Sequence, residues 1–116
     1  MTMITIYQKP TCSTCREAVK LVEASGQSYT TVNYYEKPFS KAHLQGLLKK
    51  AGLSAKDILR KKEEIYKTLG LAKKSPSEDE LLDLMVKHPD LIQRPLVEKG
   101  RKVILARPAE TVKHLL

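Results

Sequence analysis

Two cysteines, Cys12 and Cys15, are the residues of this 116-residue chain whose type and spacing best suit covalent chemistry. They form a C-x-x-C pair, and the sequence contains no other cysteine. Such a pair closes too small a loop to stabilise a fold appreciably, and a reducing cytosol opposes a structural disulfide. Zinc would need further ligands, but His43, His88 and His114 are isolated and lack zinc-finger spacing. The pair therefore favours redox or nucleophilic chemistry without a metal.

Cys12 falls where the sequence predicts the start of a helix. Apolar residues recur at helical spacing over residues 13–25, and Gly26 supplies a stop signal. A cysteine at a helix N-terminus faces unpaired backbone N–H groups and the positive end of the helix dipole, which both favour the thiolate. Arg16 adds a supporting cation one turn later. Cys15 lies on the apolar stripe of this helix, so its spacing fits a core role nearly as well as a redox role.

The elements around this helix predict an α/β fold. Strands are expected at 3–7 and 29–34, and the spacing of Thr14 and Glu17 suggests a capping box. Start signals at Ser40, at Ser54 and over 75–78 predict helices in the middle of the chain. A hairpin at 95–106 and a closing helix from Pro108 complete the order β-α-β, helical block, β-β-α. This order predicts a single domain, 1–116, with a thioredoxin-like fold: three layers, a small mixed sheet and a helical insertion at about 38–90.

Composition limits the partners that the chain is expected to bind. Its 21 Lys and Arg against 13 Asp and Glu give a net charge of +8. Acidic residues interrupt the lysines, which is typical of a solvated basic surface, although attraction of an anionic substrate or partner is the alternative. Basic and aromatic residues do not alternate, so direct nucleic-acid binding is not expected. Neither a membrane span nor a signal peptide is apparent, and we expect a cytoplasmic protein.

The sequence resembles the glutaredoxin-linked arsenate reductase family, which also includes the Spx-type transcription regulators. The resemblance extends over nearly the whole chain, in short segments that together are specific. These segments are Ile4-Thr5-Ile6-Tyr7, Pro10-Thr11-Cys12, Leu59-Arg60-Lys61, Leu69-Gly70-Leu71-Ala72, His88-Pro89, Arg94-Pro95-Leu96-Val97 and Arg107-Pro108.

The resemblance implies a reaction and a set of site residues. In reductases of this type a cysteine, matched here by Cys12, attacks arsenate with the help of three arginines, matched by Arg60, Arg94 and Arg107. The planar, permanently charged guanidinium suits a tetrahedral oxyanion. Glutathione is the implied co-substrate, glutaredoxin restores the thiol, and no bound cofactor is implied. The resemblance also predicts a cis peptide at Pro95, beside the cysteine.

Two positions depart from the family pattern and keep other functions open. Gln8 stands where well-studied members carry a histidine, and Cys15 stands where single-cysteine reductases carry a serine. A C-x-x-C pair resembles that of Spx-type proteins, so the second hypothesis is a regulator that binds RNA polymerase and is switched by a Cys12–Cys15 disulfide. The third is a general thiol oxidoreductase without oxyanion specificity. Within the reductase hypothesis, Cys15 is expected to be an auxiliary or resolving thiol.

Overall fold

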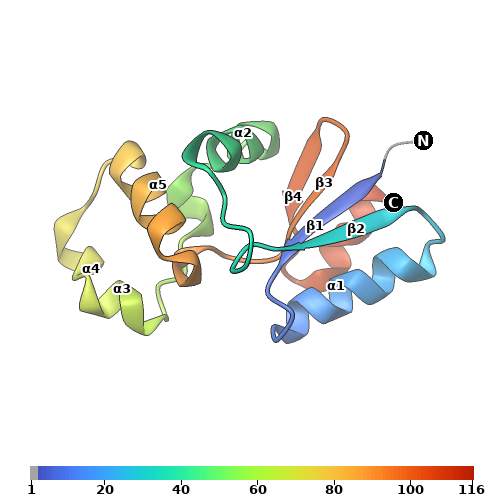
Figure 1. The fold of residues 1–116 in the computed structure, drawn as a ribbon, viewed down its shortest axis with the longest axis horizontal. Coiled ribbons are helices and arrows are strands. Elements are labelled where there is room, and N and C mark those ends of the chain that lie inside the picture. The colour runs from blue at the N-terminus through green and yellow to red at the C-terminus, as the bar shows by residue number, and fades with distance from the viewer. Residues whose placement is uncertain (1–2) are drawn as a thin grey trace. The chain divides into compact units, whose positions relative to one another are not determined.

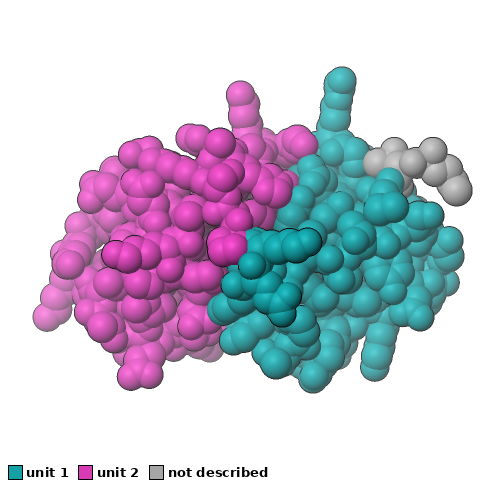
Figure 2. Space-filling model, in the orientation of Figure 1, with its two compact units in different colours: residues 1–37, 94–116 teal, residues 38–93 magenta. Residues whose placement is uncertain are grey.

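A computed structural model describes residues 3–116, which form two compact units. The first unit contains the described residues up to Lys37 together with Arg94–Leu116, and the second is the continuous segment Pro38–Gln93 (Figure 2). The insertion expected at about 38–90 lies within the second unit. No helix among residues 3–116 is long and apolar enough to cross a membrane.

The first unit is built on a mixed four-stranded sheet, as predicted. Its strands are β1 (Ile4–Gln8), β2 (Tyr29–Asn33), β3 (Leu96–Lys99) and β4 (Lys102–Leu105), in the order β2-β1-β3-β4. Strand β1 runs parallel to β2 and antiparallel to β3, and β3 and β4 form the predicted hairpin. Helix α1 (Ser13–Ala24) is the crossover between the two parallel strands (Figure 1).

Helix α1 and a C-terminal 3₁₀-helix, η3 (Ala109–Leu115), share one apolar core with the sheet. Fully burying an aliphatic side chain contributes about 1.5–3 kcal/mol, so this cluster fixes α1 firmly against β1. The cluster combines side chains of β1, α1, β3 and the C-terminal segment: Ile4, Ile6, Ala18, Val22, Val97, Ala106, Ala109, Val112 and Leu115. The start of α1 is thereby held at the end of β1.

The start of α1 differs in one respect from the sequence prediction. The helix begins at Ser13, and Cys12 is its N-cap, with an extended backbone (φ −82°, ψ 122°) and no side-chain capping bond. Thr14 is therefore already inside the first turn, and the capping box predicted from Thr14 and Glu17 is wrong. The cysteine itself occupies the position that a capping hydroxyl would otherwise take.

The named elements of the second unit are all helical, and an isolated antiparallel β-bridge joins Leu59 to Ile92. The helical elements are α2 (Lys41–Ala51), η1 (Ala55–Ile58), α3 (Glu64–Thr68), α4 (Leu71–Lys74), α5 (Glu78–Lys87) and η2 (Pro89–Leu91). Ser40 caps α2 by accepting a hydrogen bond from the His43 N–H at 3.1 Å, and Gly52 ends that helix at a positive φ of 70°. Both signals were predicted from the sequence.

Helix α5 starts one serine later than predicted. Ser77 is its N-cap and accepts a hydrogen bond from the Glu80 N–H at 3.2 Å. Ser75 instead adopts a left-handed conformation (φ 42°) at the end of α4. The start signal over 75–78 thus located the helix correctly but assigned the cap to the wrong serine.

Candidate active site around Cys12

Cys12 lies in the connection from β1 to α1, held by backbone hydrogen bonds on both sides. Its N–H donates to the Lys9 carbonyl at 2.9 Å, and its own carbonyl accepts the N–H of Arg16 at 3.1 Å, the first bond of the helix. The side chain is half-buried. The thiol therefore lies at a fixed position beside the first turn of α1.

The surroundings of Cys12 favour its thiolate. Burial alone raises the pKa of the thiol, but hydrogen bonds from the Cys15 backbone and thiol, together with the guanidinium of Arg94, outweigh it and lower the pKa to about 7. About half of the Cys12 side chains are then ionised at pH 7. The activation expected from the helix start is present. The cation that acts on the sulfur is Arg94. The side chain of Arg16 is exposed, and its supporting role remains a prediction.

Cys15 has the opposite environment although it lies only one helical turn away. Its side chain is 0% exposed, on the buried face of α1 with Ala18 and Val22. Burial raises the pKa of the Cys15 thiol to about 12, against the effect of a hydrogen bond from the Lys9 backbone. Cys15 therefore remains a neutral thiol at physiological pH, in contact with Cys12.

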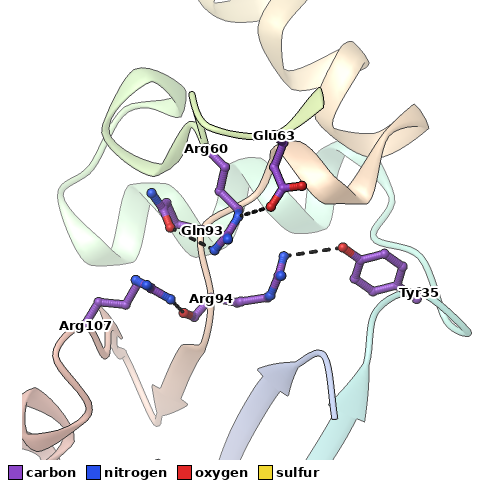
Figure 3. Close-up of polar contacts among 6 residues, drawn as sticks. All are labelled: Tyr35, Arg60, Glu63, Gln93, Arg94 and Arg107. Atoms are coloured by element: carbon purple, nitrogen blue, oxygen red, sulfur yellow. Dashed lines mark hydrogen bonds and ion pairs between the residues drawn. The ribbon is translucent and has the colours of Figure 1, made fainter. Parts of the chain in front are cut away.

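Arg94 is the buried cation of the site. Its side chain is 6% exposed, and its Nη1 donates to the Tyr35 hydroxyl at 3.4 Å (Figure 3). Burial lowers the pKa of the guanidinium, but Tyr34, Tyr35 and Cys12 raise it above its usual value, so the charge is retained. The Nε atom is buried and has no hydrogen-bond partner among residues 3–116. Leaving a buried donor without a partner costs about 1–3 kcal/mol, so this nitrogen favours the approach of an acceptor.

Arg94 and Pro95 are joined by a cis peptide bond just before β3, which confirms the sequence prediction. Arg107, at the end of β4, is also followed by a cis proline, Pro108. The exposed Arg107 side chain donates from Nη1 to the Arg94 carbonyl at 3.0 Å (Figure 3). Two of the three predicted arginines are thus directly connected within the unit that holds Cys12.

Arg60, the third predicted arginine, belongs to the second unit. Its backbone N–H donates to the Leu91 carbonyl at 2.8 Å. Its Nε forms an ion pair with Glu63 Oε1 at 3.0 Å, and its Nη1 donates to Gln93 Oε1 at 3.3 Å (Figure 3). The guanidinium is therefore oriented by neighbours of its own unit, and its role toward an oxyanion remains a prediction.

Comparison with known proteins identifies the family. The sequence model of the ArsC family matches residues 7–115. The chain belongs to the ArsC family. It is 40% identical over 116 residues to an arsenate reductase of Escherichia coli, covering 100% of this chain and 82% of that protein.

Solved structures of ArsC-family proteins confirm the predicted thioredoxin-like fold. An arsenate reductase from Vibrio cholerae superposes with a TM-score of 0.93 at 35% identity, covering 99% of this chain and 98% of that one. A putative arsenate reductase from Yersinia pestis gives a TM-score of 0.89 at 40% identity, with 96% and 98% of the two chains covered.

The candidate site of this ArsC-family chain also contains two side chains that the sequence reasoning missed. The Lys9 ammonium lies 4.8 Å from the centroid of the Tyr35 ring, and the hydroxyl of the same ring contacts Arg94. The sequence signal was a pair of tyrosines directly after β2, at a strand end where side chains of neighbouring connections gather. Among the described residues, no group of three or more His, Cys, Asp or Glu side chains is placed to hold a metal ion.

Proposed function

We propose that this protein reduces arsenate to arsenite, with the Cys12 thiolate as the nucleophile. The observation that carries the proposal is the pairing of a half-ionised Cys12 with the buried, charged guanidinium of Arg94. The Nε of Arg94 has no partner among the described residues and can serve as a donor to an oxyanion. The arsenate reductases among its relatives supply the substrate class.

Arsenate suits this pair of groups better than a neutral substrate does. An arginine binds a tetrahedral oxyanion with charge-assisted hydrogen bonds, each contributing about 1.5–3 kcal/mol. In this proposal Arg94 binds one oxygen from its buried position, and the exposed Arg107 completes the site from the next connection. Arg60 is assigned the third contact on the basis of the family resemblance.

The proposed reaction begins with the thiolate attacking arsenic. An S–As bond forms, one As–O bond breaks, and the leaving oxygen departs as water after protonation. A glutathione thiolate then attacks the Cys12 sulfur, forming an S–S bond while the electron pair of the S–As bond remains on arsenic. Arsenic is thereby reduced by two electrons and released as arsenite. Glutaredoxin then attacks the mixed disulfide and regenerates the Cys12 thiol. These thiol steps need a reducing compartment, which we propose is the cytoplasm.

The decisive experiment is an assay with arsenate, glutathione and glutaredoxin in which arsenite is measured directly. We expect turnover by the wild type and by Cys15→Ser, and no turnover by Cys12→Ser. Loss of turnover in both variants would show that Cys15 is an obligatory resolving thiol. If the wild type yields no arsenite but reduces disulfide substrates, the chain is a general thiol oxidoreductase.

An Spx-like regulator is the second candidate, supported by the contact between the two thiols in one turn of α1. Such a regulator would cycle between a Cys12–Cys15 disulfide and the dithiol, and its oxidised form would bind RNA polymerase. Co-purification with RNA polymerase that depends on oxidation, without arsenate turnover, would favour this alternative. The presence of turnover in Cys15→Ser would exclude it as the main function.

A further inference from the structure

One aromatic side chain connects the two cations that come from different segments beside Cys12. Tyr35 follows β2, and its hydroxyl accepts a hydrogen bond from Arg94 Nη1 at 3.4 Å. The Nζ of Lys9, from the connection after β1, lies 4.8 Å from the centroid of the same ring. We propose that Tyr35 is a positioning residue of the active site, holding Arg94 through its hydroxyl and Lys9 through its ring. Its effect on arsenate rests on the proposed function, whereas its effect on the Cys12 thiol does not.

The hydroxyl contact restrains the end of a long side chain. The Arg94 backbone is already held, because its carbonyl accepts a hydrogen bond from Arg107 at 3.0 Å. The guanidinium is planar, so fixing one terminal nitrogen at Tyr35 also sets the directions of its remaining N–H groups. Those groups include the buried Nε, which has no partner among residues 3–116. The hydrogen bond thus favours the orientation in which Arg94 acts on the Cys12 sulfur.

A neutral hydroxyl is better suited to this task than a carboxylate. A carboxylate would fix the guanidinium equally well, but its negative charge would cancel most of the attraction of Arg94 for a thiolate or an oxyanion. Tyr35 holds Arg94 without neutralising it.

The ring contact acts on the connection that holds Cys12. The negative face of an aromatic ring attracts an ammonium group, and this attraction keeps the Lys9 side chain over Tyr35. The Lys9 carbonyl accepts the Cys12 N–H at 2.9 Å, so restraining Lys9 also restrains the turn before α1. Through Lys9 and Arg94, Tyr35 therefore influences both the backbone and the electrostatic surroundings of the nucleophile.

Two substitutions separate the contributions of the hydroxyl and the ring. Tyr35→Phe removes the Tyr35 hydroxyl that accepts from Arg94 but keeps the ring for Lys9, while Tyr35→Leu removes both. The hydrogen bond between Arg94 and Tyr34 is present in both variants. Tyr29→Phe is a matched control, because the Tyr29 hydroxyl contacts the exposed Glu23 at 3.2 Å, away from this cluster. The first measurement is the pKa of Cys12 from the pH dependence of iodoacetamide alkylation. The second is the KM for arsenate and kcat in the glutathione and glutaredoxin assay.

We expect Tyr35→Phe to raise the pKa of Cys12 by about half a unit, which lowers the thiolate fraction at pH 7 from about one half to about one quarter. The KM for arsenate should rise about 3- to 10-fold, with a smaller change in kcat, because the arginine would bind the anion in a less ordered orientation. Tyr35→Leu should have larger effects on both quantities. Tyr29→Phe should leave both at the wild-type values.

Each outcome supports or overturns a distinct part of the proposal. An unchanged Cys12 pKa and KM in Tyr35→Phe would overturn the role of the hydroxyl. Equal effects of Tyr35→Phe and Tyr35→Leu would overturn the role of the ring, and Lys9→Gln tests that role again with an unaltered tyrosine. A shifted Cys12 pKa in a protein that never turns over arsenate would support the positioning role and refute the proposed function.

Discussion

The environments of the two thiols predict that Cys12 reacts far faster than Cys15 with an alkylating agent at pH 7. With a pKa of about 7, Cys12 is about one-half thiolate, whereas Cys15, with a pKa of about 12, is ionised in about one molecule in 100,000. The thiolate fraction of Cys12 is therefore about 50,000 times that of Cys15. A more basic thiolate is intrinsically more reactive, with a Brønsted slope of about 0.4–0.5. The Cys15 thiolate is therefore roughly 150-fold more reactive per molecule than the Cys12 thiolate. A preference of about 300-fold for Cys12 remains before the full burial of Cys15 is considered.

A pulse of iodoacetamide on the folded wild type measures this preference. Tandem mass spectrometry of the peptide that contains both cysteines assigns the site of labelling. The rate at Cys12 should titrate with an apparent pKa of about 7, and at pH 5 it should be roughly 50-fold lower than at pH 7. An inflection above pH 8 for Cys12 would refute the argument, as would labelling of Cys15 within tenfold of the Cys12 rate. Labelling after unfolding in urea is the control, because both thiols should then react at similar rates.

Three further predictions concern residues on which activity or stability depends. Arg107→Ala should lower arsenate turnover about 10- to 100-fold in the coupled assay, yet change the free energy of unfolding by less than about 1 kcal/mol, since this exposed side chain makes one hydrogen bond to a carbonyl. Glu78→Ala should lower the free energy of unfolding in urea by about 1–2 kcal/mol, because both carboxylate oxygens accept from the N–H of the buried Ala55, at 3.1 and 3.0 Å. Because the fold lowers the pKa of Cys12 from 9.0 to about 7, its thiolate adds stability that grows from about pH 7 to 9 and is lost as the pH falls through 7. The difference in unfolding free energy between the wild type and Cys12→Ser should therefore increase over this range, and a flat difference would contradict the lowered pKa.

Local signals in the sequence predicted most of the fold because they act over one or two turns. The Ser40 cap, the Gly52 stop and the hairpin around Gly100 each depend on a few neighbouring residues. Such signals fail where two of them compete. The capping pattern that begins at Ser75 overlaps a second pattern that begins at Ser77, and only the second matches the helix that forms.

In the closing helix, the spacing of the apolar residues indicated the type of helix, but only a helix of unspecified type was predicted. It was predicted only as a helix from Pro108, whereas it is a 3₁₀-helix over Ala109–Leu115. Its buried residues are Ala109, Val112 and Leu115, spaced every third position. A 3₁₀-helix has three residues per turn, so this spacing places all of them on one face. An α-helix would have rotated them progressively away from the sheet.

The candidate site was predictable only where a motif or the family resemblance marked it. Cys12 and its position at the start of a helix followed from the sequence. The contact between Tyr35 and Arg94 did not, because it joins residues 59 positions apart and forms only when β2 and β3 take their places on either side of β1. Arg16 was assigned a supporting role from its proximity in sequence, and that role remains a prediction. The effect of Arg94 on the thiol comes from a residue 82 positions away, whose burial lets solvent screen its charge less.

The high pKa of Cys15 does not exclude it from reacting with an oxidised Cys12. An external thiol at about 1 mM with a pKa near 8.5 presents roughly 0.03 mM thiolate at pH 7. With a pKa of about 12, Cys15 supplies the same concentration of thiolate when its effective concentration beside Cys12 is about 3 M. Because the Cys15 thiolate is more basic, it is roughly 40-fold more reactive than the external thiolate. The effective concentration that Cys15 needs is therefore only about 0.1 M. Well-aligned neighbouring groups reach effective concentrations of about 10⁵ M, so contact between the two thiols is sufficient even with imperfect alignment.

Cys15 is therefore expected to capture a sulfenic acid on Cys12 as a disulfide before further oxidation, although arsenate reduction does not require it. Treatment of the wild type with hydrogen peroxide should yield the Cys12–Cys15 disulfide, detected by mass spectrometry as a loss of two hydrogens. In Cys15→Ser the same treatment should yield the irreversible sulfinic and sulfonic acids of Cys12, and turnover should not return after reduction. Equal recovery of both proteins would mean that the two sulfurs are too poorly aligned to react, and burial would then be the whole role of Cys15.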